Sequence, residues 1–394
     1  MTSLRLSRLL YPKDELEAAF TTAILVGQTD EVIYWCAELH SSGWNPFHTI
    51  WHTYYNFYAV LNPHLAHYLS KKEHVYMTQH VLSACATAAK NLHLARWQLD
   101  TFLLKQLAIQ SPPPAHVFRG RMPNWLSKLK TEGLDLSSCR VAQAILKGNW
   151  QDIVAYMSAA IKDGATFHNI SSIVREAFRY KKREEVQQLP GLDIHKDNEE
   201  YRGTALVANI MYLTMTEKES CESRLYVPLT EEELGNWETY RTSLDGCEIA
   251  CERYDILPRR IQYGMKGNIL NSLELARHTL DPAFCDKAWQ RYAESHCYET
   301  PYWRERIEKC NGVPSQETGY LTFDTDNNDE RFYDTYWIHP DEQTEALRQT
   351  VMPPLDTKIT GDWILHIVQS LYWCEGLIEH NEGIQWIANR RLTL

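Results

Sequence analysis

Long hydrophobic runs are missing from this chain of 394 residues. A membrane-spanning helix needs about 20 consecutive apolar residues, and the apolar stretch from Ala205 to Leu213 is interrupted by Asn209. The first ten residues include Arg5 and Arg8, and they lack the apolar core of a secretory signal. The sequence therefore predicts a soluble protein with no membrane span.

Several catalytic signatures are absent as well. The sequence contains no Gly-x-x-x-x-Gly-Lys-Ser/Thr loop, whose backbone amides would bind phosphates, and no Gly-x-Ser-x-Gly elbow. The ten cysteines are dispersed, which indicates reduced thiols and an intracellular protein of the cytoplasm or nucleus. We therefore expect no catalytic residue and no cofactor, and the sequence favours a non-enzymatic protein while leaving an enzyme open as an alternative.

The charge balance argues against direct binding of nucleic acid. The chain has 40 Lys and Arg against 51 Asp and Glu, a formal net charge of −11, which repels a phosphate backbone. Short basic clusters occur at residues 119–121, 179–183 and 390–391. They lack the extended basic stripe of a nucleic-acid interface, and we interpret them as solvated helix ends.

The sequence does contain a recurring pattern: a helix-capping residue, then apolar residues at helical spacing, then a residue that ends the helix. This pattern predicts a mainly α fold. We expect an array of antiparallel helical hairpins over residues 1–188, a linker at 189–203 and a second, mostly helical domain at 204–394. One helix is expected at about 74–92, another at 171–186 and a short strand at 320–323. Asn45-Pro46 predicts the start of a further helix, whose apolar stripe continues to Leu61.

Tyrosine and tryptophan are abundant, with 22 Tyr and 13 Trp against 10 Phe. Such polar-tipped rings are favoured both in cores and at protein interfaces. We expect seven of them to form core or interaction surfaces: Trp35, Trp44, Trp51, Tyr54, Tyr58, Trp303 and Tyr333.

Three ligand patterns resemble metal sites, and none of the three is complete. His48 and His52 stand four residues apart on one predicted helix but lack the glutamate that zinc proteases place beside the first histidine. Cys247 and Cys251 lack a second ligand pair. The acidic run at 324–329 lacks the glycine and the bidentate glutamate of a calcium loop. The sequence thus predicts no metal, with His48 and His52 as the first candidates if one is bound.

Two blocks of the chain resemble an uncharacterised family of α-helical proteins encoded by large nucleocytoplasmic DNA viruses. The first block comprises Trp35 to Leu39, Ser42-Gly43, Trp51, Phe57 to Ala59 and Asn62-Pro63. The second comprises Trp289, Tyr292-Ala293, Thr300-Pro301, Trp303, Arg306-Ile307, Phe323-Asp324, Glu330, Phe332-Tyr333, Tyr336 and Pro340 to Gln343. The resemblance implies a viral origin and carries no functional residue to this chain. Residues 23–55 also resemble, less closely, the helical collar of clamp-loader ATPases.

These observations, together with the viral origin that the resemblance implies, favour a non-enzymatic helical scaffold or adaptor in virion architecture or in a replication or transcription assembly. Its partners would be other proteins of that assembly, in the host cytoplasm or nucleus or in the virion. Two alternatives stay open. One is a replication accessory protein resembling a clamp-loader collar, and the other is an enzyme whose site is assembled from dispersed residues.

Overall fold

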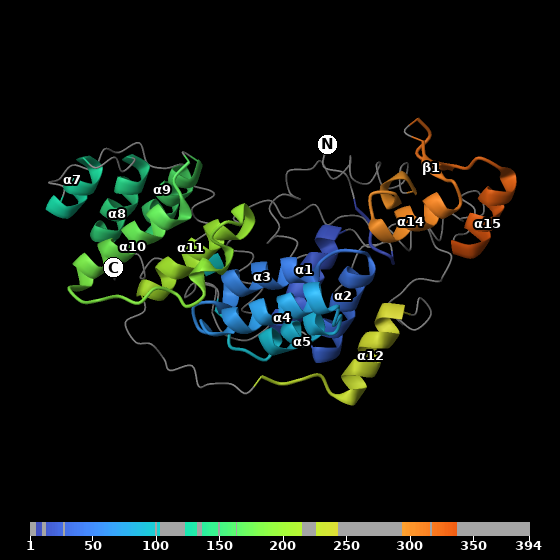
Figure 1. Cartoon of the computed structure of the whole chain (residues 1–394), viewed down its shortest axis with the longest axis horizontal. Coiled ribbons are helices and arrows are strands. Elements are labelled where there is room, and N and C mark those ends of the chain that lie inside the picture. Colours follow the sequence, from blue (N-terminus) through green and yellow to red (C-terminus); the bar gives the residue numbers. More distant parts are fainter. Residues whose placement is uncertain are drawn as a thin grey trace, which may run out of the picture. The chain divides into compact units, whose positions relative to one another are not determined.

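A computed structural model describes the chain mainly as helices (Figure 1). The residues that it describes are 5–9, 13–26, 28–98, 101–102, 123–131, 136–148, 150–162, 164–214, 226–242, 294–315 and 317–336. Within these ranges the prediction of a mainly α fold is confirmed, because the strands are limited to β1 (Val313–Pro314) and β2 (Leu321–Thr322), which pair antiparallel. None of the helices in these ranges has the length and apolarity that crossing a membrane requires.

The chain divides into two compact units, each built from segments that are separate in the sequence. Among the described residues, the first unit takes those within 5–49, 79–93 and 227–336, and the second takes those within 50–78 and 94–226. The division of the sequence at residues 189–203 stays a prediction.

Helix α2 (Thr29–Ser41) is central to the first unit, where it contacts α1 (Lys13–Val26), α5 (Ala84–His93) and α12 (Glu231–Thr242). A capping box between Gln28 and Glu31 begins the helix. Gly43 follows its end with φ +86, and a Cβ at this position would lie 2.7 Å from the Pro301 Cβ. A glycine is therefore required here both by the backbone conformation and by the space available.

Helix α12 is attached to the N-terminal helices by polar contacts as well as by its buried Trp237. The Lys90 ammonium lies 2.6 Å from a Glu233 carboxylate oxygen. The Asn91 side chain both donates to and accepts from the backbone of Val227, at 2.8 Å in each case. These contacts join residues more than 130 positions apart, so α12 completes the core that α2 and α5 begin.

A second cluster of the first unit is built around the β-hairpin, α14 (Pro301–Lys309) and α15 (Asp326–Tyr336). Its buried residues are Leu6, Cys297, Trp303, Ile307, Cys310, Leu321, Phe332 and Tyr333. The Trp303 indole donates to the Ser7 carbonyl at 3.1 Å, and the Thr300 hydroxyl donates to the Leu6 carbonyl at 2.5 Å. The N-terminal segment thereby becomes part of this cluster, and the strand expected at 320–323 is observed as β2.

The second unit contains the end of α3 (Pro46–Thr53), a π-helical turn and most of the remaining helices. Their bounds are η1 (Tyr54–Tyr58), α4 (Leu65–Gln79), α7 (Asn124–Thr131), α8 (Leu136–Lys147), α9 (Trp150–Lys162), α10 (Phe167–Lys182), η2 (Leu192–His195) and α11 (Glu199–Thr214). Helix α8 contacts α7, α9 and α10, which appear together in Figure 1, and α11 contacts η1 and η2.

Two of the predicted helices require correction. The single helix expected at 74–92 is wrong, because α4 ends at Gln79 and α5 begins at Ala84, with His80 between them in a left-handed conformation of φ 53. The stripe from Phe47 to Leu61 is not one regular α-helix either. After Thr53 the chain widens into the π-helical turn, in which the Ala59 amide donates to the Tyr54 carbonyl at 2.9 Å.

Candidate functional site

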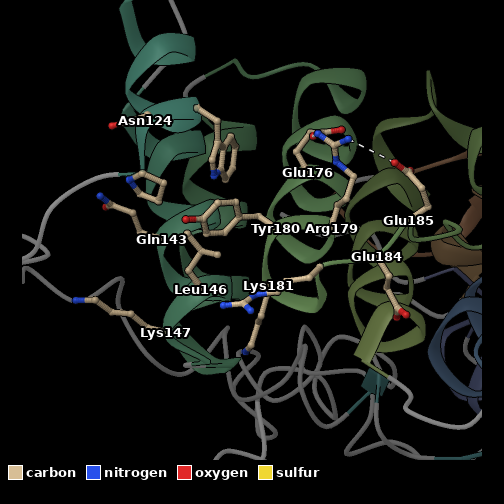
Figure 2. A pocket seen from close by; sticks show the side chains of 13 residues that line it. Asn124, Gln143, Leu146, Lys147, Glu176, Arg179, Tyr180, Lys181, Glu184 and Glu185 are labelled. Atoms are coloured by element: carbon tan, nitrogen blue, oxygen red, sulfur yellow. Dashed lines mark hydrogen bonds and ion pairs between the residues drawn. The ribbon is translucent and has the colours of Figure 1, made fainter.

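A broad groove is formed in the second unit by residues of α7, α8 and α10 and of the segment after α10 (Figure 2). Its volume is about 1420 Å³. The lining residues are Pro123, Asn124, Trp125, Gln143, Leu146, Lys147, Glu176, Arg179, Tyr180, Lys181, Arg183, Glu184 and Glu185. This volume exceeds the range of about 300–1,000 Å³ that is typical of small-molecule pockets, so the groove is large enough for a segment of polypeptide.

Helix α10 positions most of the charged lining. Thr166 caps the helix by accepting a hydrogen bond from the Asn169 amide at 3.2 Å, and the chain leaves the helix at Arg183 with φ 59. One face is buried at helical spacing, through Phe167, Ile170, Ile173, Val174, Ala177 and Phe178. Because that face packs inward, Arg179 and Tyr180 are exposed at the C-terminal end.

Two aromatic side chains form the apolar part of the groove. The rings of Trp125 and Tyr180 have centroids 6.0 Å apart and an interplanar angle of 43°. Tyr180 extends from α10 toward Gln143 and Leu146 of α8, as Figure 2 shows. Its side chain is 57% exposed. Tyrosine and tryptophan are the residues that most often contribute strongly to binding at protein interfaces.

The charged lining is mixed in sign. Arg179 lies 2.6 Å from a Glu176 carboxylate oxygen and 3.4 Å from one of Glu185. The Lys181 ammonium donates to the Ile145 carbonyl at 3.2 Å, and burial lowers the pKa of this lysine from its usual value. Lys147 and Lys181 extend on one side of the Tyr180 ring (Figure 2).

The chemistry of this lining suits binding. It includes no Ser, Thr, Cys or His, so the groove supplies no hydroxyl or thiol nucleophile with an adjacent histidine base. The basic run at 179–183, which its short length indicates is a solvated helix end, contributes Arg179, Lys181 and Arg183 to the lining.

The two histidines named as metal candidates each lie beside a carboxylate. The Nδ1 of His48 is 3.6 Å from a Glu17 oxygen in the first unit, and the Nε2 of His52 is 3.4 Å from a Glu200 oxygen in the second. Glu200 is thus a further potential ligand beside His52, with His48 one turn earlier on α3. The spacing of the histidines could not reveal this glutamate, which is 148 positions away. The absence of a bound metal stays a prediction.

A cluster of aromatic rings and a histidine surrounds the π-helical turn. The Tyr55 hydroxyl is 3.0 Å from the Nδ1 of His195, and the His195 ring meets Trp51 edge to face with centroids 4.3 Å apart. The Trp51 indole donates to a Glu73 carboxylate oxygen at 2.8 Å. Burial lowers the pKa of His195 to about 4 and raises the pKa of Tyr55 above its usual value.

These shifts keep the imidazole of His195 neutral and the phenol of Tyr55 protonated at neutral pH. A phenol with a raised pKa is a poor proton donor and is not a nucleophile. Trp51 and Tyr55 are fully buried, so the cluster contributes to the packing of the second unit. Sequence reasoning found Trp51 through its helical spacing and missed His195, because the two are joined only by tertiary contact.

The seven residues expected in core or interaction surfaces are nearly all buried. Trp35, Trp51, Tyr54, Tyr58, Trp303 and Tyr333 are buried, and Trp44 is partly exposed. The acidic run at 324–329 folds as a turn into α15, where Asp324 accepts hydrogen bonds from the side chains of Asn311 and Asn328 at 2.9 and 2.7 Å. Cys247 and Cys251 lie outside the described residues, as do Trp289 and residues 340–343 of the second resemblance block.

Comparison of the chain with known protein families, with functionally characterised proteins and with solved structures finds no match.

Proposed function

We propose that this chain is a non-enzymatic helical adaptor, and that its groove between α7, α8 and α10 binds a segment of another protein. The observation that carries the proposal is the exposed Tyr180, which lies beside Trp125 in a groove of about 1420 Å³. Contact between the apolar surface of this ring and water is unfavourable in the unbound protein. A partner that covers the ring removes this surface from water, which favours binding by about 25 cal/mol per Å² of apolar area.

The helices around the groove support this role because they are packed against one another. Helix α8 packs against both α9 and α10, and its residues Cys139, Val141, Ala142, Ala144 and Ile145 are fully buried. A groove between packed helices keeps its shape before the partner arrives, which reduces the ordering cost of binding. We further propose, from the resemblance to viral proteins, that the partner belongs to a virion or to a replication or transcription assembly.

A replication accessory protein resembling a clamp-loader collar is one alternative to this proposal. An enzyme with a dispersed site, for which His48 and His52 are the first candidates, is the other alternative.

A photo-crosslinking experiment tests the proposal. A benzophenone amino acid replaces Tyr180 in one variant and Tyr320 in the matched control, since both tyrosines are more than half exposed and Tyr320 is not a lining residue. The variants are produced in the cells in which the protein naturally acts, irradiated and purified. We expect discrete protein adducts at position 180 and none of the same mass at position 320. Identical adducts at the two positions, or none at position 180, would refute the groove as the binding surface.

A further inference from the structure

We propose that His48, His52 and Glu200 form a binding site for one divalent metal ion of the zinc class. The inference is independent of the groove and of its partner, because these residues belong to α3 and α11 and do not line the groove. The sequence alone predicts no metal, since the two histidines lack a third ligand in their own segment. The fold supplies that ligand from 148 positions away.

The spacing of the three side chains fits a shared metal ion. One nitrogen of each histidine and one oxygen of Glu200 lie within 4.8 Å of one another. Tetrahedral zinc binds nitrogen and carboxylate oxygen at about 2.0–2.2 Å, which places two ligand atoms about 3.4 Å apart. The Nε2 of His52 and the Oε1 of Glu200 are 3.4 Å apart. This pair therefore already has the spacing of two ligands on one metal, and a small side-chain rotation brings His48 to the same spacing.

Regular elements of the fold position each ligand. His48 and His52 stand four residues apart on α3, so their side chains lie one turn apart on one face of the helix. Glu200 lies in the first turn of α11, where its amide donates to the Asn198 side-chain oxygen at 2.9 Å. The His52 ring meets Tyr201 edge to face, with centroids 5.1 Å apart. The second unit thus places Glu200 beside His52, and the helix that His48 shares with His52 adds the third ligand.

A further carboxylate lies beside one of the two imidazoles. An oxygen of Glu17 is 3.6 Å from the Nδ1 of His48. Histidines that bind a metal usually direct their second ring N–H to a carboxylate or a carbonyl, which fixes the orientation of the ring and raises its basicity. Glu17 is placed to act on His48 in this way, as a positioning residue.

The ligand set favours zinc over magnesium or calcium. Imidazole nitrogen suits zinc and related transition metals, whereas magnesium and calcium prefer oxygen ligands. Two histidines and one glutamate form a set with which zinc keeps a fourth position for water. The side chains of His48, His52 and Glu200 are 35, 30 and 45% exposed, so an ion can reach them from solvent while the chain stays folded.

The test measures the binding of zinc to the full chain. The protein is treated with a chelator, desalted and titrated with zinc chloride in competition with a chromophoric chelator, and we expect one zinc ion per chain. The double variant His48→Ala/His52→Ala and the single variant Glu200→Gln should each bind zinc at least tenfold more weakly, because even groups that only orient the ligands change the affinity by about 10- to 100-fold. The matched control, His67→Ala/His74→Ala, removes two exposed histidines of α4 that are not part of the group.

A second measurement separates loss of the site from loss of the fold. An ion that binds the folded chain stabilises it, so added zinc should raise the urea midpoint of the unaltered chain. The midpoint of Glu200→Gln should not respond to zinc. Without zinc it should stay close to that of the unaltered chain, because a half-exposed ion pair such as that of Glu200 with His52 contributes little to stability.

Equal loss of zinc binding in the two double variants would overturn the inference, since surface histidines in general would then hold the ion. Unchanged affinity in Glu200→Gln would also overturn it and would leave His52 and Glu200 as an ordinary surface ion pair. Failure of the unaltered chain to bind one zinc ion would have the same consequence.

Discussion

The buried ion pair between Arg8 and Glu38 yields the sharpest prediction about stability. Their side chains are 3% and 1% exposed, and the Arg8 Nε and Nη2 atoms lie 3.1 and 2.9 Å from the Glu38 Oε2. The other Glu38 oxygen accepts the Leu9 amide at 2.8 Å. Arg8 also donates to the carbonyls of Tyr240 and Arg241, at 2.8 and 2.9 Å, at the end of α12. One guanidinium thus joins the N-terminal segment, α2 and α12.

The substitution Glu38→Gln keeps the shape of the side chain and removes its charge. The Arg8 guanidinium then stays buried without a counter-ion, which costs about 3–5 kcal/mol in comparable buried pairs. The double variant Arg8→Met/Glu38→Leu removes both charges, and we expect it to recover part of that loss. Recovery should be incomplete, because the Leu9 amide and the α12 carbonyls lose their partners.

Urea denaturation followed by circular dichroism measures these differences. The matched control is Glu238→Gln, because Glu238 pairs with Arg241 on α12 at 56% exposure, where an ion pair contributes at most about 1 kcal/mol. We expect the midpoint to move at least three times as far for Glu38→Gln as for Glu238→Gln, and the double variant to lie between them. Similar midpoints for the two single variants would show that the buried pair does not organise the first unit.

Two further predictions concern the aromatic cluster of the second unit. Trp51→Ala removes a fully buried ring and should lower the free energy of unfolding by about 3–5 kcal/mol. His52→Ala, at a partly exposed site, should lower it by less than about 1 kcal/mol. A larger shift of the denaturant midpoint for His52→Ala than for Trp51→Ala would show that His52, and not Trp51, is the residue important for stability. Burial lowers the pKa of His195 to about 4, so between about pH 6.5 and 4 the unfolded chain binds a proton that the folded chain does not, and stability should fall as the pH falls. His195→Gln should remove this part of the pH dependence, and an unchanged slope in urea midpoints measured from pH 7 to 4 would contradict the burial of a neutral imidazole.

Local sequence signals determined many of the helices. Pro46 begins α3, Gly43 follows α2, and the apolar spacing of Phe47, Trp51 and Tyr54 marks the buried face. These signals act within a few residues, through backbone conformation, capping and side-chain period. They can therefore be recognised from a single sequence. The widening into a π-helix at Tyr54 has no comparable signature in the sequence, because the backbone N–H and C=O groups of the same residues could equally be paired by regular α-helical hydrogen bonds.

What the tertiary structure alone decided is which distant residues meet. Arg8 meets the end of α12 across more than 230 positions, and His52 meets Glu200 across 148. The groove combines α7, α8 and α10, whose separate sequences show only amphipathic helices and one short basic run. Such pairings depend on how complete helical faces pack and on the entropy of closing long loops. The sequence by itself therefore determines a helical chain with identifiable core faces. The groove depends on packing, because its lining residues form one surface only when α8 and α10 lie against each other.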